Sequence, residues 1–270
     1  MGDLEDYFRG NKGRLITKWR HYFEIYERHF AHYRGRPVRV LEYGVWQGGS
    51  LQMWRSYFGP QAEVVGVDVR PECARFAEQG IDVVIGDQAD PATHRGLRER
   101  YGTFDIVIDD GGHRPEQQIT TFLEIYPALT PGGTYMVEDV HTSYMPGWGG
   151  GLRHPGTFIE FAKRIIDQLH AWYGPIPGLQ GDDLTRTAFG LHFYDSMVVI
   201  EKRELEVPMP LYSGEPTLPL DARELEFLAY MDALAGRRDQ AAARYRRALE
   251  LRPDDEALLK LLRELESGPA

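Results

Sequence analysis

Residues 38–50 read VRVLEYGVWQGGS, and this stretch decides the fold class. Its first six residues have the β-branched and apolar character of a short strand, and a glycine-rich turn and a helical stretch at 51–58 follow at once. Glycines between a strand and a helix let the backbone approach a ligand closely. The stretch therefore predicts the first strand, turn and helix of an α/β domain.

The same alternation continues toward the C-terminus. Further strands are expected at 63–68, 82–86, 104–110 and 134–138, with helices at 72–79, 91–101, 115–128 and about 156–173. Two β-rich runs then meet at Asp195 and Ser196, a pair that favours a tight turn and an antiparallel hairpin. This order predicts an α/β fold with a doubly wound, mostly parallel Rossmann-like sheet that ends in the hairpin.

Helical patterns stand on either side of this predicted sheet. Residues 15–33 repeat apolar and aromatic side chains at the spacing of one helix face, which predicts an N-terminal helical cap whose rings are core. Residues 221–266 resemble one tetratricopeptide repeat plus a following helix. We expect a main domain at 1–206 and a linker with a tetratricopeptide-like tail at 207–270. Because one repeat cannot bury a core alone, the tail is expected to dock on the main domain or on a second subunit of a homo-oligomer.

Composition narrows the class of protein. The 270 residues carry 31 basic and 41 acidic side chains, for a formal net charge of −10, which argues against nonspecific nucleic-acid binding. No apolar run approaches the roughly 20 residues of a membrane span, and no basic region followed by an apolar one opens the chain. The single cysteine, Cys73, rules out an internal disulfide and a zinc ribbon. Together these features favour a cytoplasmic protein that acts on a small molecule.

Three predicted strand ends carry groups that suit a nucleoside ligand. Asp68 ends the second strand, where an acid holds ribose hydroxyls, and Asp87 with Gln88 ends the third, where the pair can read an adenine edge. The first turn is not G-x-G-x-x-G and the chain has no phosphate-cradling G-x-x-x-x-G-K-[ST], so S-adenosylmethionine fits better than a dinucleotide. The alternative is that the glycines only form a turn and the acids only cap helices. The residues expected to contact the cofactor are Tyr22, Glu42, Gly44, Gly48, Ser50, Asp68, Asp87, Gln88 and Asp109.

Two pairs of carboxylates follow the fourth and fifth strands. They would repel strongly unless they were protonated or bridged by a cation, and oxygen ligands of this kind suit Mg²⁺. We expect Asp110, Glu138 and Asp139 to be the metal ligands, with helix capping and arginine pairing as the alternative. His113 lies three residues after Asp110 and is the expected general base. His141 ranks below it, as a base, a substrate contact or a packed side chain.

The motifs together resemble a known family. The spacing from Glu42 through Gly44 and Gly48 to Ser50 resembles the first motif of the class I S-adenosylmethionine-dependent methyltransferases, E/D-x-G-x-x-x-G-x-S. The acids with a base three residues after the first resemble the metal-dependent O-methyltransferases, the group of catechol O-methyltransferase. Those enzymes have a lysine at the position of His113, whereas sugar O-methyltransferases of antibiotic pathways have a histidine. The resemblance to this second group covers roughly 10–205 and includes the stretches 18–23, 86–88, 109–113 and 138–144.

This resemblance implies a Mg²⁺-dependent O-methyltransferase that acts on a deoxysugar hydroxyl, with S-adenosylmethionine as the methyl donor and with Asp110, His113 and His141 as catalytic residues. The sugar would be carried by a nucleotide or by a glycosylated natural product. Three alternatives remain open on the sequence alone. They are methylation of a phenol or other hydroxylated metabolite, a non-methylating tailoring reaction, and a binding module with a vestigial nucleotide site.

Overall fold

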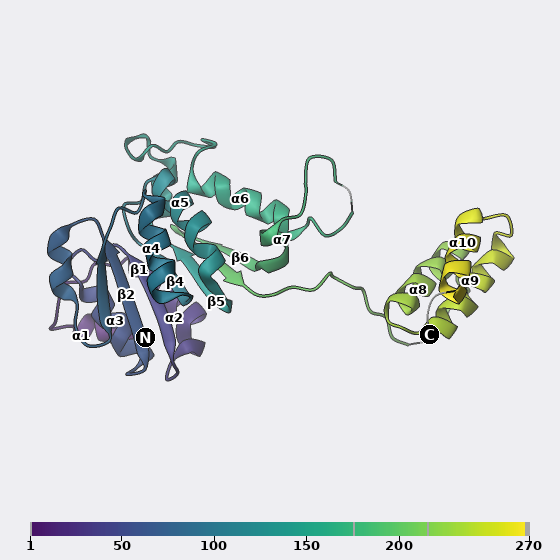
Figure 1. Ribbon diagram of the computed structural model, residues 1–270, viewed down its shortest axis with the longest axis horizontal. Helices are drawn as coiled ribbons and strands as arrows, with labels where there is room; N and C mark the ends of the chain where they lie inside the picture. The colour runs from purple at the N-terminus through teal and green to yellow at the C-terminus, as the bar shows by residue number, and fades with distance from the viewer. Residues whose placement is uncertain (1, 175, 215, 268–270) are drawn as a thin grey trace. The chain divides into compact units, whose positions relative to one another are not determined.

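The computed structural model describes residues 2–174, 176–214 and 216–267. By its internal contacts the chain divides into two compact units, residues 1–206 and 207–270. The first unit contains the α/β sheet and the second contains the C-terminal helices (Figure 1).

Within the described residues, seven strands form one mixed sheet in the order β3-β2-β1-β4-β5-β7-β6. The strands β1 to β5 run parallel, and β7 pairs antiparallel with both β5 and β6. The predicted doubly wound sheet and its terminal hairpin are confirmed. The strands are β1 (Val38–Tyr43), β2 (Ala62–Asp68), β3 (Ile81–Ile85), β4 (Phe104–Asp109), β5 (Leu129–Val137), β6 (Ala188–Tyr194) and β7 (Met197–Lys202).

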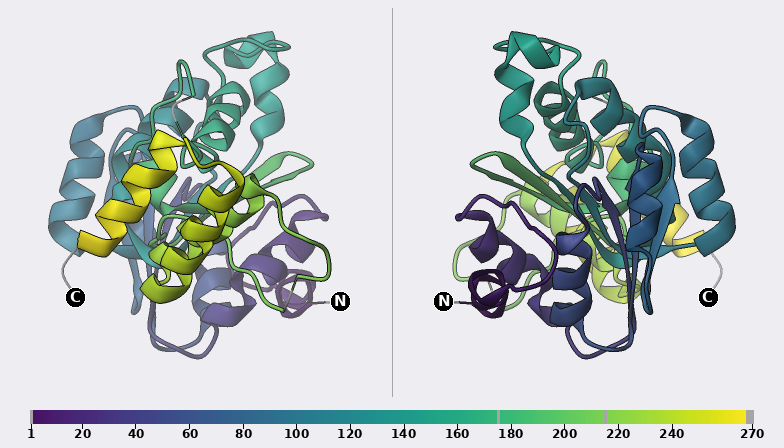
Figure 2. Two further views of the ribbon diagram at one scale, coloured as in Figure 1. Left: turned by 90° about the vertical axis from the view of Figure 1, so that its right-hand side faces the viewer. Right: turned by 90° about the vertical axis from the view of Figure 1, so that its left-hand side faces the viewer.

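Helices cover both faces of the sheet (Figure 1, Figure 2). Alternate residues of a strand point to opposite faces, so Val40 packs with α2 and α3 on one side while Leu41 packs with α4, α5 and α6 on the other. The helices of this unit are α1 (Asp3–Gly10), α2 (Tyr22–Phe30), α3 (Gly49–Phe58), α4 (Pro91–Tyr101), α5 (Pro115–Ile125), α6 (Phe158–Leu169) and α7 (Asp183–Thr187). Short 3₁₀ turns are η1 (Ala31–Tyr33), η2 (Pro71–Phe76), η3 (Tyr126–Ala128), η4 (Val140–Tyr144) and η5 (Pro146–Trp148).

The N-terminal cap differs from the single helix expected over residues 15–33. The helix begins only at Tyr22, and the residues before it form an irregular segment. Trp19, whose ring was expected in the core, is 55% exposed, and Leu15 of the same expected helix face is 60% exposed. The segment packs closely on the start of α3, because a Cβ on Gly49 would lie 2.4 Å from the carbonyl oxygen of Leu15. Tertiary contacts therefore override the helical pattern in residues 15–21.

Three other boundaries also differ from the sequence prediction. The expected helix at 72–79 is the 3₁₀ turn η2, and the helix expected at 156–173 spans only Phe158–Leu169. Strand β5 begins at Leu129, so it includes the Thr-Pro-Gly-Gly stretch that was expected to separate helix from strand. The register of β5 against β4 shifts across this stretch, which lets the strand accommodate the proline.

The second unit is helical. It contains α8 (Ala222–Leu234), α9 (Arg238–Leu251) and α10 (Glu256–Ser267) around a small core that includes Leu225, Ala229 and Tyr245. In the part of the chain that the structure describes, no helix combines the length and the apolarity needed to cross a bilayer.

The glycine after β1 is required by its geometry. Gly44 has a φ of 91°, and a Cβ there would lie 2.0 Å from the backbone carbonyl oxygen of Asp110. Gly44→Ala is expected to destabilise the first unit by about 3 kcal/mol, because the side chain meets both a steric clash and an unfavourable φ. All five tryptophans lie between residues 19 and 172, so urea unfolding followed by tryptophan fluorescence reports on this unit.

The matched control is Gly96→Ala in α4, where nothing lies within 4 Å of the added Cβ. Alanine should stabilise that helix position by about 0.5–1 kcal/mol. Equal unfolding midpoints for the two variants would contradict the assigned role of Gly44.

Candidate active site

The parallel strands end level with one another and so place their following residues at one edge. Tyr43 of β1 pairs with Val67 of β2 and with Asp109 of β4, and Asp109 pairs in turn with Val137 of β5. The carboxyl ends of parallel strands are where open α/β sheets bind ligands. The acids predicted from the sequence therefore lie at the edge where a ligand would bind.

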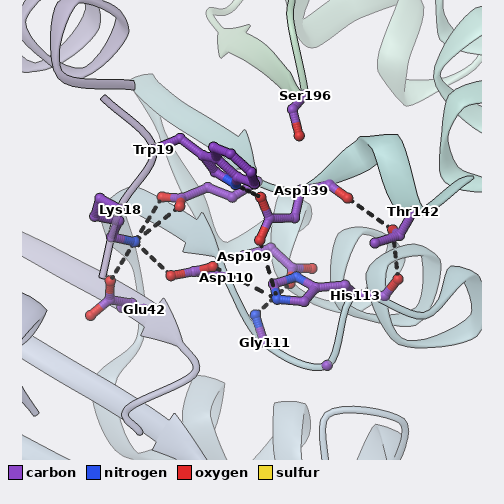
Figure 3. A network of polar contacts seen from close by, with 12 residues as sticks. Lys18, Trp19, Glu42, Asp109, Asp110, Gly111, His113, Asp139, Thr142 and Ser196 are labelled. Carbon is purple, nitrogen blue, oxygen red and sulfur yellow. Dashed lines mark hydrogen bonds and ion pairs between the residues drawn. The ribbon is translucent and has the colours of Figure 1, made fainter. Parts of the chain in front are cut away.

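The ammonium group of Lys18 lies among three of these carboxylates (Figure 3). Its Nζ is 2.6 Å from Asp110 Oδ2, 2.9 Å from Glu138 Oε2 and 3.7 Å from Glu42 Oε1. The Lys18 side chain is 2% exposed, and those of Glu42 and Glu138 are 0% and 1% exposed. A buried cation thus neutralises part of a strongly negative cluster.

Burial and charge act in opposite directions on these groups. Burial alone would lower the pKa of Lys18, but the carboxylates of Asp110, Glu138 and Glu42 outweigh it and hold that pKa well above the ordinary value. Burial, followed by the charge of Asp110, raises the pKa of Glu138 well above its ordinary value although Lys18 opposes the shift. Lys18 therefore carries its charge at neutral pH, and removal of that charge would leave buried carboxylates without a partner.

His113 lies between two of the predicted acids. Its Nε2 is 3.5 Å from Asp139 Oδ2 and 4.0 Å from Asp110 Oδ1, and the three residues each offer one ligand atom within 4.8 Å of the others. His113 and Asp139 both have a φ of 53°, a left-handed conformation that is uncommon outside glycine. Strained backbone of this kind concentrates at functional sites. The Nδ1 atom of His113 is buried and has no hydrogen-bond partner.

Aromatic residues from the N-terminal segment and α2 hold the acids of β5. Asp139 Oδ1 accepts hydrogen bonds from Trp19 Nε1 at 3.0 Å and from the Tyr22 hydroxyl at 2.7 Å. The hydroxyl of Tyr26 donates to Glu138 Oε1 at 2.7 Å. The oxygens of Glu138 are therefore occupied by Lys18 and Tyr26, whereas Asp139 keeps one oxygen directed at His113.

The predicted metal ligands consequently do not all meet at one point. Asp110 and Asp139 converge together with His113, but Glu138 belongs to the group around Lys18. His141 was predicted as a second catalytic residue. Its Nδ1 contacts Ser196 Oγ and lies 3.9 Å from Asp139 Oδ1, and His141 does not belong to the group formed by Asp110, His113 and Asp139.

A cavity of about 570 Å³ opens beside this group. Of the residues predicted to contact the cofactor, four line it: Gly44, Asp68, Asp87 and Gln88. Asp110, His113 and Asp139 line the same cavity, so the predicted cofactor site and the predicted chemistry share one space. The other predicted cofactor residues, Tyr22, Glu42, Gly48, Ser50 and Asp109, are not among its lining residues.

Three of these other residues, Glu42, Gly48 and Ser50, shape the junction between β1 and α3 next to the cavity. Glu42 accepts hydrogen bonds from Ser50 Oγ at 2.7 Å and from Trp54 Nε1 at 2.9 Å, which fixes α3 to the end of β1. Gly48 precedes α3 as its N-cap, with a φ of 73°. Glu42 and Ser50, both predicted to contact the cofactor, form a buried hydrogen-bonded pair in this structure.

Hydrogen bonds also orient the polar groups of the cavity. Asp68 Oδ2 accepts from the backbone N–H groups of Val45 and Trp46, and its other oxygen accepts from Arg70. Burial opposes ionisation of Asp68, but the hydrogen bonds from Arg70 outweigh it and lower the pKa of this carboxyl. Asp68 is thus a fixed, ionised acceptor at the end of β2.

Gln88 is held by the β4 turn. Its Nε2 donates to Asp109 Oδ1 at 2.6 Å, and its Oε1 accepts from the backbone N–H of Gly112 at 3.0 Å. Asp109 is fully buried, and its Oδ2 has no hydrogen-bond partner. Burial raises the pKa of Asp109 to about 7, despite the hydrogen bonds that it accepts from Gln88 and Gly111.

Sequence reasoning missed Lys18, Trp19 and Arg70. Trp19 was expected in the core of a helix, and Lys18 was noted only within the stretch 18–23 that carries the resemblance, so neither was given a role in the site. One signal could have drawn attention to Lys18: it is one of only five lysines in the chain and lies within an aromatic stretch. The neighbouring residues do not indicate which acids Lys18 contacts.

Residues 41–140 match the family described as a methyltransferase domain. The chain carries a methyltransferase domain. The resemblance inferred from the motifs is therefore confirmed, and the matched range includes Gly44, Asp68, Asp110, His113 and Asp139.

Two relatives of the methyltransferase domain come from Streptomyces olivaceus. The 8-demethyl-8-(2-methoxy-alpha-L-rhamnosyl)-tetracenomycin-C 3'-O-methyltransferase is 40% identical over an alignment of 240 residues, and the match covers 81% of this chain and 59% of the relative. The 8-demethyl-8-alpha-L-rhamnosyl tetracenomycin-C 2'-O-methyltransferase is 41% identical over an alignment of 191 residues, and the match covers 67% of this chain and 50% of the relative. The chain thus spans about half to three fifths of the length of these relatives.

A solved structure shares the fold. The MycE methyltransferase from the mycinamycin biosynthetic pathway, in complex with Mg and SAH, is 36% identical and has a TM-score of 0.66. The match covers 75% of this chain and 54% of that chain.

Removal of the Lys18 charge tests its place in the methyltransferase domain. Lys18→Met is expected to lower the free energy of unfolding by about 3–5 kcal/mol, because Glu42 and Glu138 lose their buried counter-ion. The measurement is urea unfolding followed by tryptophan fluorescence. Lys163→Met is the matched control, since Lys163 is half exposed and pairs only with Glu160, so it should change stability by less than about 1 kcal/mol. A Lys18→Met variant as stable as this control would contradict the assignment.

The buried Asp109 predicts a dependence of stability on pH. Its raised pKa means that the folded chain keeps a proton between about pH 4 and 7 that the unfolded chain has lost, so stability falls as the pH rises. In a metal-free buffer, Asp109→Asn should remove about 1.4 kcal/mol per pH unit from this downward slope. Unfolding free energies at pH 5, 6 and 7 measure it, and parallel curves for variant and wild type would show that Asp109 ionises normally.

Proposed function

We propose that this chain is a Mg²⁺-dependent O-methyltransferase that moves a methyl group from S-adenosylmethionine to a hydroxyl of a deoxysugar. The observation that carries the proposal is the convergence of Asp110, His113 and Asp139 on a cavity of about 570 Å³ at the carboxyl edge of the sheet. The two tetracenomycin relatives methylate sugar hydroxyls of glycosylated natural products. The sugar of the substrate is therefore expected to be attached to an aglycone or to a nucleotide.

The cavity suits the proposed methyl donor. Asp68 and Asp87 offer carboxylates at the ends of β2 and β3, where ribose hydroxyls and an adenine edge would be bound. Gly44 and Gly111 leave backbone exposed to the ligand, and Trp46, which is 44% exposed, lines the same wall. The negative lining also favours a ligand that carries a sulfonium charge.

The donor set also suits the proposed metal ion. Asp110 and Asp139 would hold Mg²⁺, because carboxylate oxygens are its preferred ligands and both side chains are only partly buried. Glu138 would join them only after Lys18 had moved away, since its oxygens are taken by Lys18 and Tyr26. When bound, Mg²⁺ would lower the pKa of a neighbouring hydroxyl, and S-adenosylmethionine would supply the methyl group.

A residue of the site can accept the proton of the reacting hydroxyl. His113 would accept it at Nε2, the ring nitrogen that faces the acids. Asp110 and Asp139 each have an oxygen within 4.0 Å of that atom, so their negative charge stabilises the imidazolium that forms. Trp19 and Tyr22 hold Asp139 in position, and we infer that His141 and Ser196 support the same carboxylate from behind. Positioning and base catalysis thus come from side chains that are already ordered.

The hydroxyl that receives the methyl group is decided by substrate contacts outside this group. The two tetracenomycin relatives are about equally similar to the chain, yet one is a 3'-O- and the other a 2'-O-methyltransferase. A phenolic acceptor or a non-methylating reaction would use the same cavity differently. The mass gained by the acceptor separates methylation from insertion of an oxygen atom, and fragmentation of the product shows whether the methyl group is on the sugar or on a phenol.

Two substitutions test the mechanism. His113→Ala is expected to lower turnover by about 10²–10⁴-fold because the base is lost. Asp110→Asn should lower turnover and weaken Mg²⁺ binding. Both variants should still bind S-adenosylhomocysteine, which calorimetry measures, and mass spectrometry of a rhamnosylated acceptor measures turnover. The exposed His170→Ala is the matched control. Near-normal turnover in either variant would refute the role assigned to the substituted residue, and absence of S-adenosylhomocysteine binding by the wild type would refute the proposed function.

We further propose that residues 207–270 form a linker and one tetratricopeptide-type helix pair with a following helix. Helices α8 and α9 pack against each other through Ala229, Tyr245 and Ala248. Phe227 and Tyr230 of α8 remain 52% exposed, which supports a further docking partner such as a second subunit.

A further inference from the structure

A second group of metal-ligating side chains lies away from the candidate active site. His29 of α2, His192 of β6 and Glu201 of β7 each offer one ligand atom, and these atoms lie within 4.8 Å of one another. Glu201 pairs with Thr134 inside β5, whereas the acids of the active site follow Val137, three residues further along that strand. The group is therefore distinct from the site proposed for methyl transfer.

We propose that His29, His192 and Glu201 form a binding site for a divalent transition metal ion such as Zn²⁺. Glu201 Oε1 lies 3.1 Å from His192 Nε2 and 3.7 Å from His29 Nδ1. Ligand atoms of tetrahedral zinc lie about 3.4 Å apart when the bonds are about 2.0–2.1 Å, so both separations are close to those that zinc requires. Two imidazoles and one carboxylate are also a donor set that zinc uses when water completes the coordination.

Contacts behind the ligands orient them. His29 Nε2 lies 2.9 Å from the hydroxyl of Tyr194, and a metal-bound imidazole usually hydrogen-bonds an oxygen through its other ring nitrogen. This contact leaves His29 Nδ1 directed at Glu201. The second oxygen of Glu201 lies 3.6 Å from Arg203, which holds the carboxylate with Oε1 toward the two imidazoles.

The surroundings provide access and space. His192 is 40% exposed, so an ion can reach the group from solvent. A cavity of about 280 Å³, lined by His29, His32 and Glu201, adjoins the ligands and has room for a coordinated water. A metal here would connect α2 with the β6–β7 hairpin. The opposite end of α2 carries Tyr22, which holds Asp139, so the ion would stabilise the helix that supports the active site.

Zinc titration of the full chain tests the proposal. The protein is first treated with a chelator and then titrated with ZnCl₂ against a chromophoric competitor, in excess MgCl₂ to occupy oxygen-rich sites. We expect one zinc ion per chain at this site. His192→Ala and Glu201→Gln should each weaken its binding at least tenfold, because each removes one of three ligands. Co²⁺ in place of Zn²⁺ should give a visible absorption band that these variants lose.

Two controls separate this site from others. His170→Ala removes an exposed histidine outside the group and should leave zinc binding unchanged. His113→Ala removes the imidazole of the active site and should also retain it. Glu201→Gln keeps the shape of the side chain, so it carries the test if His192→Ala does not fold by circular dichroism. The proposal is overturned if the wild type binds no zinc, or if zinc is lost with His113→Ala and retained with His192→Ala.

Discussion

The site at the carboxyl edge of this sheet depends on one buried cation. Lys18 brings a positive charge to Glu42, Asp110 and Glu138, which come from three neighbouring strands. Without it, the almost fully buried carboxylates of Glu42 and Glu138 would have no counter-ion, an arrangement that proteins avoid. The ion pair therefore connects the N-terminal segment, the end of β1 and the acids beside His113 in one electrostatic unit.

This unit explains why the acids differ in what they can do. The carboxylates of Glu42 and Glu138 are fully engaged in hydrogen bonds and ion pairs within the protein. Asp110 and Asp139 each keep one oxygen directed toward His113. Burial alone does not explain this difference between the carboxylates. The difference depends on which carboxylates Lys18, Tyr22 and Tyr26 contact. The two acids that keep an available oxygen are those that line the cavity.

The features that could be predicted from the sequence are the local ones, and those that depend on long-range contacts could not. The strands and the glycine turn after β1 could be predicted because alternation, glycine and length are local properties of 38–50 and its neighbours. The acids at the strand ends could be placed at one edge because parallel strands align there. Lys18 could not be placed, since its partners Asp110 and Glu138 lie 92 and 120 residues away in the sequence.

The order of the strands has a consequence for how the site is first made. Strand β5, which carries Glu138 and Asp139 at its end, lies between β4 and β7, and β7 begins only at Met197. Ser196, just before it, accepts from Tyr22 and contacts His141. On the ribosome, the nascent chain therefore lacks the far neighbour of β5 until residue 202 has emerged from the exit tunnel. The edge that carries the candidate site is completed late in translation of the first unit, so ligands that bind there would stabilise the finished domain rather than its growing precursor.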